Sequence, residues 1–112
     1  MLTHLHRVEL ATAWRLKVFR GEITPDVANR AEADLLHDIA AGVWASPGYV
    51  LSSVFDRAEA LARSHSSSIG TRTLDALHVA AALELRTRSF VTADRRQAKL
   101  ARAAGLRVTS LR

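Results

Sequence analysis

Apolar residues at helical spacing predict two helices in the first part of the chain. Over residues 4–20 they occupy most of the helix circumference, so the first helix is expected to be largely buried. Gly21 suits its C-terminal end. The second helix is expected from Pro25 to about Ala41, because Thr24 can cap it and apolar residues follow at four-residue spacing.

The middle of the chain predicts one more helix between irregular segments. Residues 43–45 have the character of a short strand, and Pro47-Gly48 is typical of a turn. Apolar positions at a helical period then indicate a helix over about 53–64. The serine-rich stretch 65–70 is expected to be a polar loop.

The last third alternates between helical and strand patterns with short links. Helices are expected over 72–86 and 95–104, and strands over 89–92 and 106–109. Such alternation predicts an α/β fold with a parallel sheet flanked by helices. No central strand is evident before residue 43, so the sheet is expected to be incomplete at its start.

Length and composition narrow the class of protein. The chain of 112 residues suffices for one modest core, so residues 1–112 are expected to form a single domain. Cysteine is absent, which excludes disulfides and thiolate metal sites. No apolar run is long enough to cross a membrane and no secretion signal opens the chain, so a cytoplasmic protein without a membrane partner is expected.

Charge is distributed unevenly and favours a polyanionic partner. The net charge is +5, and 14 of the 16 basic residues are arginine, whose planar guanidinium makes forked contacts to phosphate. Residues 1–71 hold seven basic and eight acidic residues, whereas residues 72–112 hold nine basic and three acidic. The basic last third suits a nucleic acid, although a merely solvated arginine-rich surface explains the same numbers.

Asp75 lies where a purely structural acid would be costly. Nine of the twelve residues in 74–85 are apolar, so this helix is expected to be buried nearly all round. A buried carboxylate needs a partner or a metal, but an acid in the first turn can also simply complement the helix dipole. His78, one turn further on, is interpreted as a hydrogen-bonded core histidine, and Trp14 and Trp44 as core residues.

Two more acids, Glu9 and Asp94, occupy unexpected positions. Glu9 falls in an apolar stripe of the first helix, where the alternative to a functional acid is a salt bridge to an arginine such as Arg7 or Arg72. Asp94 directly follows a predicted strand, and ligands bind at the carboxyl ends of parallel strands. Its spacing from Gln97 is also that of a capping box, and the two roles are compatible.

Three carboxylates brought to one point would repel each other, and a hard divalent cation relieves that repulsion. Mg²⁺ and Mn²⁺ prefer oxygen ligands of this kind. Such a cation polarises a phosphate and activates water for attack on phosphorus. If the fold brings them together, the acids Glu9, Asp75 and Asp94 therefore suit phosphodiester hydrolysis.

Three stretches of the last third carry the pattern of a known family. Residues 72–85 read RTLDALHVAAALEL, residues 90–97 read FVTADRRQ and residues 101–108 read ARAAGLRV. In this order and spacing they resemble the site helix, the strand with its turn, and the ending of PIN-domain ribonucleases of the VapC toxin type. The earlier part of the chain is similar to that family in layout only.

The resemblance implies a PIN-like three-layer sandwich and a ribonuclease. Glu9, Asp75 and Asp94 correspond to three of the family's four site acids, which implies that they hold Mg²⁺ or Mn²⁺ for hydrolysis of RNA by water. The fourth acid belongs to an opening strand that this chain is expected to lack, so the fold is expected to be N-terminally incomplete.

The resemblance also implies supporting residues and partners. Thr92 would orient Asp94 or a metal-bound water, and Arg72 and Arg95 would bind phosphate or neutralise the acids. A homodimer and a cognate antitoxin are implied as partners, with RNA as the substrate.

Two other interpretations remain open from the sequence. A catalytically degenerate PIN remnant would bind RNA or an antitoxin without cleaving. A helical DNA-binding module would also use the basic last third, but its arginines spread over helices, loops and strands instead of one recognition helix.

Overall fold

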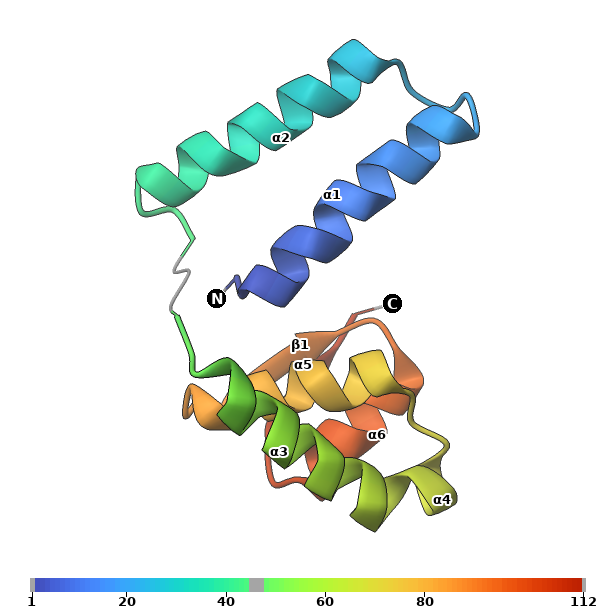
Figure 1. The fold of residues 1–112 in the computed structure, drawn as a ribbon, viewed down its shortest axis with the longest axis vertical. Coiled ribbons are helices and arrows are strands. Elements are labelled where there is room, and N and C mark those ends of the chain that lie inside the picture. The colour runs from blue at the N-terminus through green and yellow to red at the C-terminus, as the bar shows by residue number, and fades with distance from the viewer. Residues whose placement is uncertain (1, 45–47, 112) are drawn as a thin grey trace. The chain divides into compact units, whose positions relative to one another are not determined.

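The computed structural model describes residues 2–44 and 48–111 (Figure 1). The chain divides into two compact units, Met1–Gly48 and Tyr49–Arg112. Each unit has its own arrangement of elements, and the single domain expected over 1–112 stays a prediction.

The N-terminal unit is a pair of helices joined by a short turn. Helix α1 spans His4–Phe19 and helix α2 spans Pro25–Ala40. The Thr3 hydroxyl accepts a hydrogen bond from the His6 amide at 3.2 Å, and Thr24 likewise caps α2. Both predicted helices are therefore confirmed, and a threonine caps the N-terminus of each one.

The prediction that the first helix is largely buried is wrong for the structure described. No residue of α1 is buried, and the side chain of Phe19 is 86% exposed. Two packed helices cover only one face of each other, so apolar residues around the rest of the α1 circumference have nothing to pack against within this unit. Trp14 is accordingly half-buried and Trp44 is 44% exposed, so neither is a core residue.

The predicted short strand at 43–45 is not formed at its described positions. Val43 and Trp44 lie in a bend that follows α2, and Ala45 is outside the described residues. The amide of Val43 donates to the carbonyl of Asp38, which wraps the chain back on the helix end instead of extending it. Of the predicted Pro47-Gly48 turn, Pro47 likewise lies outside the described residues.

The C-terminal unit begins with helical segments. Helix α3 spans Leu51–Leu61 and continues through a π-helical turn, η1, Ala62–Ser66, into the short α4, Ser67–Ile69. The polar loop predicted at 65–70 is therefore wrong, because the serines continue the helical path until Gly70. Gly70 ends it with a φ of 78°, a left-handed conformation that glycine adopts without steric cost.

The last third folds as its alternating pattern predicts. Helix α5 spans Thr73–Glu84, strand β1 Ser89–Thr92, helix α6 Arg95–Ala103 and strand β2 Arg107–Ser110. The two strands pair in parallel, with Phe90 opposite Val108, and α6 is the crossover between them (Figure 1). A mostly helical chain with a short parallel sheet is compatible with an α/β fold.

Small side chains allow close packing at the core of the C-terminal unit. Helix α5 buries Ala80 and Ala81 completely, together with Val79. Against it pack α3 and α6, with Leu100 of α6 fully buried. The buried character predicted for the 72–86 helix is thereby confirmed. The packing of α5 against α6 brings the first turn of α5 into contact with the first turn of α6. Among the described residues no helix has the length and apolar character needed to cross a membrane.

Candidate functional site

Asp75 occupies the third position of α5 and is only 7% exposed. Its Oδ2 accepts a hydrogen bond of 2.9 Å from the backbone amide of Arg72, just ahead of the helix. The carboxylate therefore satisfies a backbone donor at the helix N-terminus, where the helix dipole also favours negative charge. The structural role that the sequence left open is real, and it leaves the other carboxylate oxygen for a different contact.

Asp94 directly follows β1 and serves as the N-cap of α6. Its Oδ1 accepts from the backbone amide of Gln97 at 3.0 Å, so the predicted cap is confirmed. In a full capping box the Gln97 side chain would accept a hydrogen bond from the Asp94 backbone amide, but here that amide has a different acceptor. The Asp94 amide donates to the hydroxyl of Thr92 at 3.0 Å, which frees the Gln97 side chain.

The Gln97 side chain connects the Asp75 carboxylate to Thr92, and through Thr92 to the backbone amide of Asp94. The Nε2 of Gln97 donates to Oδ1 of Asp75 across 3.4 Å, a long hydrogen bond. Its Oε1 accepts from the Thr92 hydroxyl at 2.9 Å. A carboxylate only accepts, so the amide nitrogen must face Asp75, and the orientation of every donor in the chain follows from this.

Gln97 is the residue of the candidate site that sequence reasoning missed. Its spacing from Asp94 indicated only a cap, and nothing local relates it to Asp75, which lies 22 residues earlier. The contact exists because α5 and α6 pack together at the carboxyl end of β1. The signal available in the sequence was a polar side chain, Gln97, on the same face of the predicted helix as the apolar Leu100 and Ala101.

The arrangement supplies oxygen ligands of the type that hard cations prefer. Each Asp75 oxygen accepts one hydrogen bond. Asp94 is exposed, and among the described residues no group donates a hydrogen bond to its Oδ2. A carboxylate has about four acceptor sites, so both acids retain capacity for a cation. Carboxylate oxygens are the donors that Mg²⁺ and Mn²⁺ prefer. Within residues 2–44 and 48–111, no three His, Asp or Glu side chains lie close enough together to hold a metal.

The remaining predicted site residues lie as follows. Glu9 is half-buried on α1, in the N-terminal unit, so its place beside the other acids stays a prediction. Arg72 immediately precedes α5 and Arg95 opens α6, and both are exposed. They therefore flank Asp75 and Asp94 in sequence, as phosphate-binding residues would. His78 is 4% exposed, which confirms its burial in the core.

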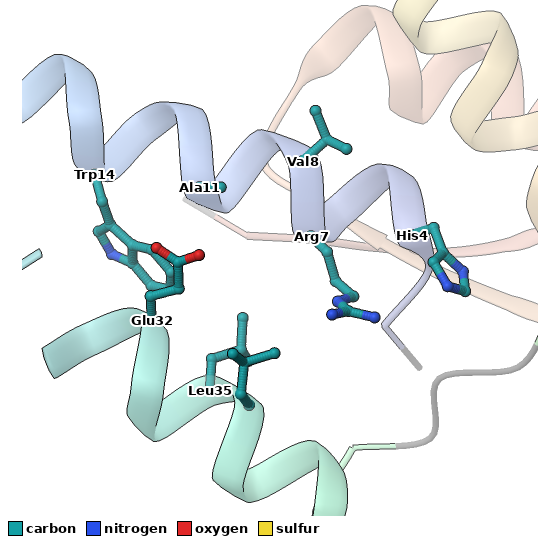
Figure 2. A pocket seen from close by; sticks show the side chains of 8 residues that line it. His4, Arg7, Val8, Ala11, Trp14, Glu32 and Leu35 are labelled. Atoms are coloured by element: carbon teal, nitrogen blue, oxygen red, sulfur yellow. The ribbon is translucent and has the colours of Figure 1, made fainter. Parts of the chain in front are cut away.

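A separate pocket of about 310 Å³ lies between α1 and α2 in the N-terminal unit. Figure 2 shows the Trp14 side chain extending from α1 toward Glu32 on α2, whose carboxylate is paired with Arg15 at 2.7 Å. No predicted site residue lines this pocket, so it does not mark the candidate site. Its lining is His4, Arg7, Val8, Ala11, Trp14, Glu32, Leu35 and Leu36.

No protein-family model, curated protein or solved structure matches the chain. The residues and their geometry are therefore the basis for any functional assignment.

Proposed function

We propose that this protein is a metal-dependent endoribonuclease of the VapC-like PIN type. One observation carries the proposal: a buried acid, Asp75, is linked through Gln97 and Thr92 to a second acid, Asp94, at the end of a parallel strand. Three different elements supply these groups. Divalent-cation sites use carboxylates gathered at the carboxyl edge of a sheet, and a chain of hydrogen bonds from Asp75 to the backbone of Asp94 supports such a site here.

Each residue has a distinct part in the proposed chemistry. Asp75 and Asp94 would hold the cation, with Glu9 as the third acid. A bound Mg²⁺ or Mn²⁺ supplies charge stabilisation and an activated water for attack on phosphorus. Gln97 would orient the Asp75 carboxylate, and Thr92 would hold both the Gln97 amide and the backbone at Asp94. Phosphoryl transfer depends on positioning more than on side-chain reactivity, so these contacts would matter for the rate.

The charge of the C-terminal region supports RNA as the substrate. Residues 72–112 contain nine basic residues against three acidic ones. Arg72 and Arg95 stand beside the two acids in the chain and are exposed, so their guanidinium groups are open to a phosphodiester. They would hold the backbone and offset the repulsion between substrate and carboxylates.

A binding-only protein is the second candidate, and a specific observation favours it. Asp75 and Asp94 each satisfy a backbone amide at a helix start, so both acids would be retained in a protein that had lost catalysis. Such a degenerate PIN domain would bind RNA or an antitoxin without cleaving. Activity, not geometry, separates these two candidates.

A toxin of this kind would act in the cytoplasm as a homodimer held in check by a cognate antitoxin. Exposed apolar side chains support such partners, since large apolar surface on a folded chain is typical of interaction sites. Phe19 on α1 is 86% exposed, and Phe55 on α3 is 51% exposed.

The test is cleavage of RNA by the full chain with Mg²⁺ or Mn²⁺, by Asp75→Asn, and by the control Asp56→Asn. Asp56 is an exposed acid on α3, so its substitution removes the same charge outside the site. We expect the full chain and the control to cleave, and Asp75→Asn and EDTA-treated samples to lose at least 100-fold in rate, on the order of a removed catalytic group.

The outcomes separate the candidates. Cleavage that persists in Asp75→Asn or in EDTA contradicts a metal site built on this acid. RNA binding by a folded chain that shows no cleavage with either cation replaces the nuclease by the binding-only protein.

A further inference from the structure

The exposed face of α6 is uniformly basic. In its nine residues the helix carries no acid and four cations, all exposed. With 3.6 residues per turn, these cations fall within an arc of about 120°, opposite the buried Ala98, Leu100 and Ala101. We call this set the basic ridge, and it consists of Arg95, Arg96, Lys99 and Arg102.

The placement of these charges opposes helix stability. Arg95 and Arg96 lie in the first turn, where the helix dipole is positive and disfavours cations. Lys99 stands four residues from Arg95 and three from Arg102, so like charges are neighbours on the helix surface. Asp94 at the N-cap is the one acid beside the ridge in the chain.

Within the described residues, no acidic side chain pairs with these cations to relieve their repulsion. The ion pairs found among the described residues join Arg15 with Glu32, Arg57 with Glu84 and Arg63 with Glu59, and none of them includes a residue of α6. In residues 2–44 and 48–111, no ridge cation makes a side-chain hydrogen bond or ion pair. Because the repulsion among these four cations is not offset within the fold, we infer that a polyanion outside the chain binds them.

We propose that the basic ridge binds the phosphate backbone of single-stranded RNA, on the stretch of strand next to the candidate site. This inference rests on the proposed function for the location of the site. The ridge starts at the residue after Asp94 and runs about 10 Å along α6, at 1.5 Å per residue. An RNA strand bound along the basic ridge would therefore extend to Asp94.

The side chains of the ridge indicate contact with phosphate and not with bases. Three of the four are arginines, whose guanidinium matches phosphate oxygens in a forked geometry. The uncharged polar side chain of α6, Gln97, which could also read base edges, faces inward to Asp75. Binding by the ridge is therefore independent of nucleotide sequence and strongly dependent on salt.

The test measures the affinity of the full chain for a short single-stranded RNA oligonucleotide of mixed sequence, in EDTA, at several salt concentrations. The variant is Arg96→Gln/Lys99→Gln, and neither residue belongs to the candidate site. The control is Lys17→Gln/Arg30→Gln, which removes one lysine and one arginine from exposed helical positions of the N-terminal unit.

Each lost phosphate contact lowers the slope of log affinity against log salt by about 0.7 for single strands. The ridge variant should therefore lose about 1.4 in slope, and the control none. Between 50 and 200 mM salt, the full chain should lose roughly 7-fold more affinity than the ridge variant. The melting temperature of the ridge variant should equal or exceed that of the full chain, because like charges are removed.

An unchanged slope in the ridge variant overturns the proposal, and so does an equal loss in the control. Competition by polyglutamate as strong as by RNA of the same charge also overturns it, in favour of an acidic protein. If the ridge variant melts early, Arg102→Gln alone is expected to lower the slope by about 0.7. Because binding is measured in EDTA, failure of the nuclease proposal leaves this result interpretable.

Discussion

At the scale of single residues, Gln97 connects the parts of the candidate site. Its amide has one donor side and one acceptor side, and the structure uses both, toward Asp75 and Thr92. Thr92 in turn accepts from the amide of Asp94, so each hydrogen bond determines the direction of the next. An isosteric change at Gln97 therefore tests the whole chain of contacts.

Gln97→Glu should destabilise the protein by about 1–3 kcal/mol, the cost of a buried polar group left without its partner. The new carboxylate faces Asp75, which is also a carboxylate and is 7% exposed. Urea unfolding measures the change, with Asn29→Asp as the matched control, because Asn29 is an exposed amide on α2. Equal stability of both variants would show that the long hydrogen bond between Gln97 and Asp75 contributes nothing to the free energy of unfolding.

At the scale of elements, helix starts combine structure with candidate chemistry. Both acids of the site lie in or before the first turn of a helix, Asp75 in α5 and Asp94 in α6. A helix N-terminus leaves backbone amides unpaired, and a carboxylate satisfies them while keeping further oxygen lone pairs. The two roles therefore separate only under substitutions that keep the acceptor and remove the charge.

Asp94→Asn and Asp94→Ala provide this separation. Asparagine caps a helix about as well as aspartate, so Asp94→Asn should keep the free energy of unfolding, whereas Asp94→Ala should lose about 1 kcal/mol. Both should lose metal-dependent RNA cleavage. Urea unfolding and the cleavage assay are measured on the same samples, and full cleavage by Asp94→Asn would restrict Asp94 to capping.

At the scale of the whole molecule, charge follows the division into two units. Residues 1–48 hold five basic and six acidic residues, whereas residues 49–112 hold eleven basic and five acidic. The acids linked by Gln97 and the basic ridge both belong to the second unit. The proposed contacts with RNA and two of the three proposed metal ligands therefore belong to the same unit.

Metal binding at the proposed site should raise the stability of the whole chain, because a ligand bound only by the folded state favours folding. At a free Mn²⁺ concentration ten times the dissociation constant, the gain is about 1.4 kcal/mol. Thermal unfolding should show a rise in melting temperature that EDTA reverses. The rise should be absent in Asp75→Asn and intact in Asp56→Asn. An equal rise in Asp75→Asn would place the cation elsewhere.

Local patterns were enough for most elements of the chain. The helices that start after Thr24 and Arg72 and the cap at Asp94 depend on side chains within a few residues of each other. The parallel pairing of β1 with β2 joins residues 18 positions apart, and the alternation of strand, helix and strand was enough to predict it. The polar stretch 65–70 failed as a loop because serine is compatible with a helical turn when Gly70 supplies the end. The serine hydroxyl groups did not indicate whether the helix ends before residue 65 or continues to Gly70.

The sequence by itself determined the first two helices, the order of helices and strands in the last third, the basic character of that third and the choice of the three candidate acids. Periodicity and capping act over a few residues, so a linear pattern contains them. Only the tertiary structure decided that Gln97 joins Asp75 to Thr92, and that α1 buries none of its residues. Both facts depend on which surfaces meet after folding, and packing between distant segments has no local signature.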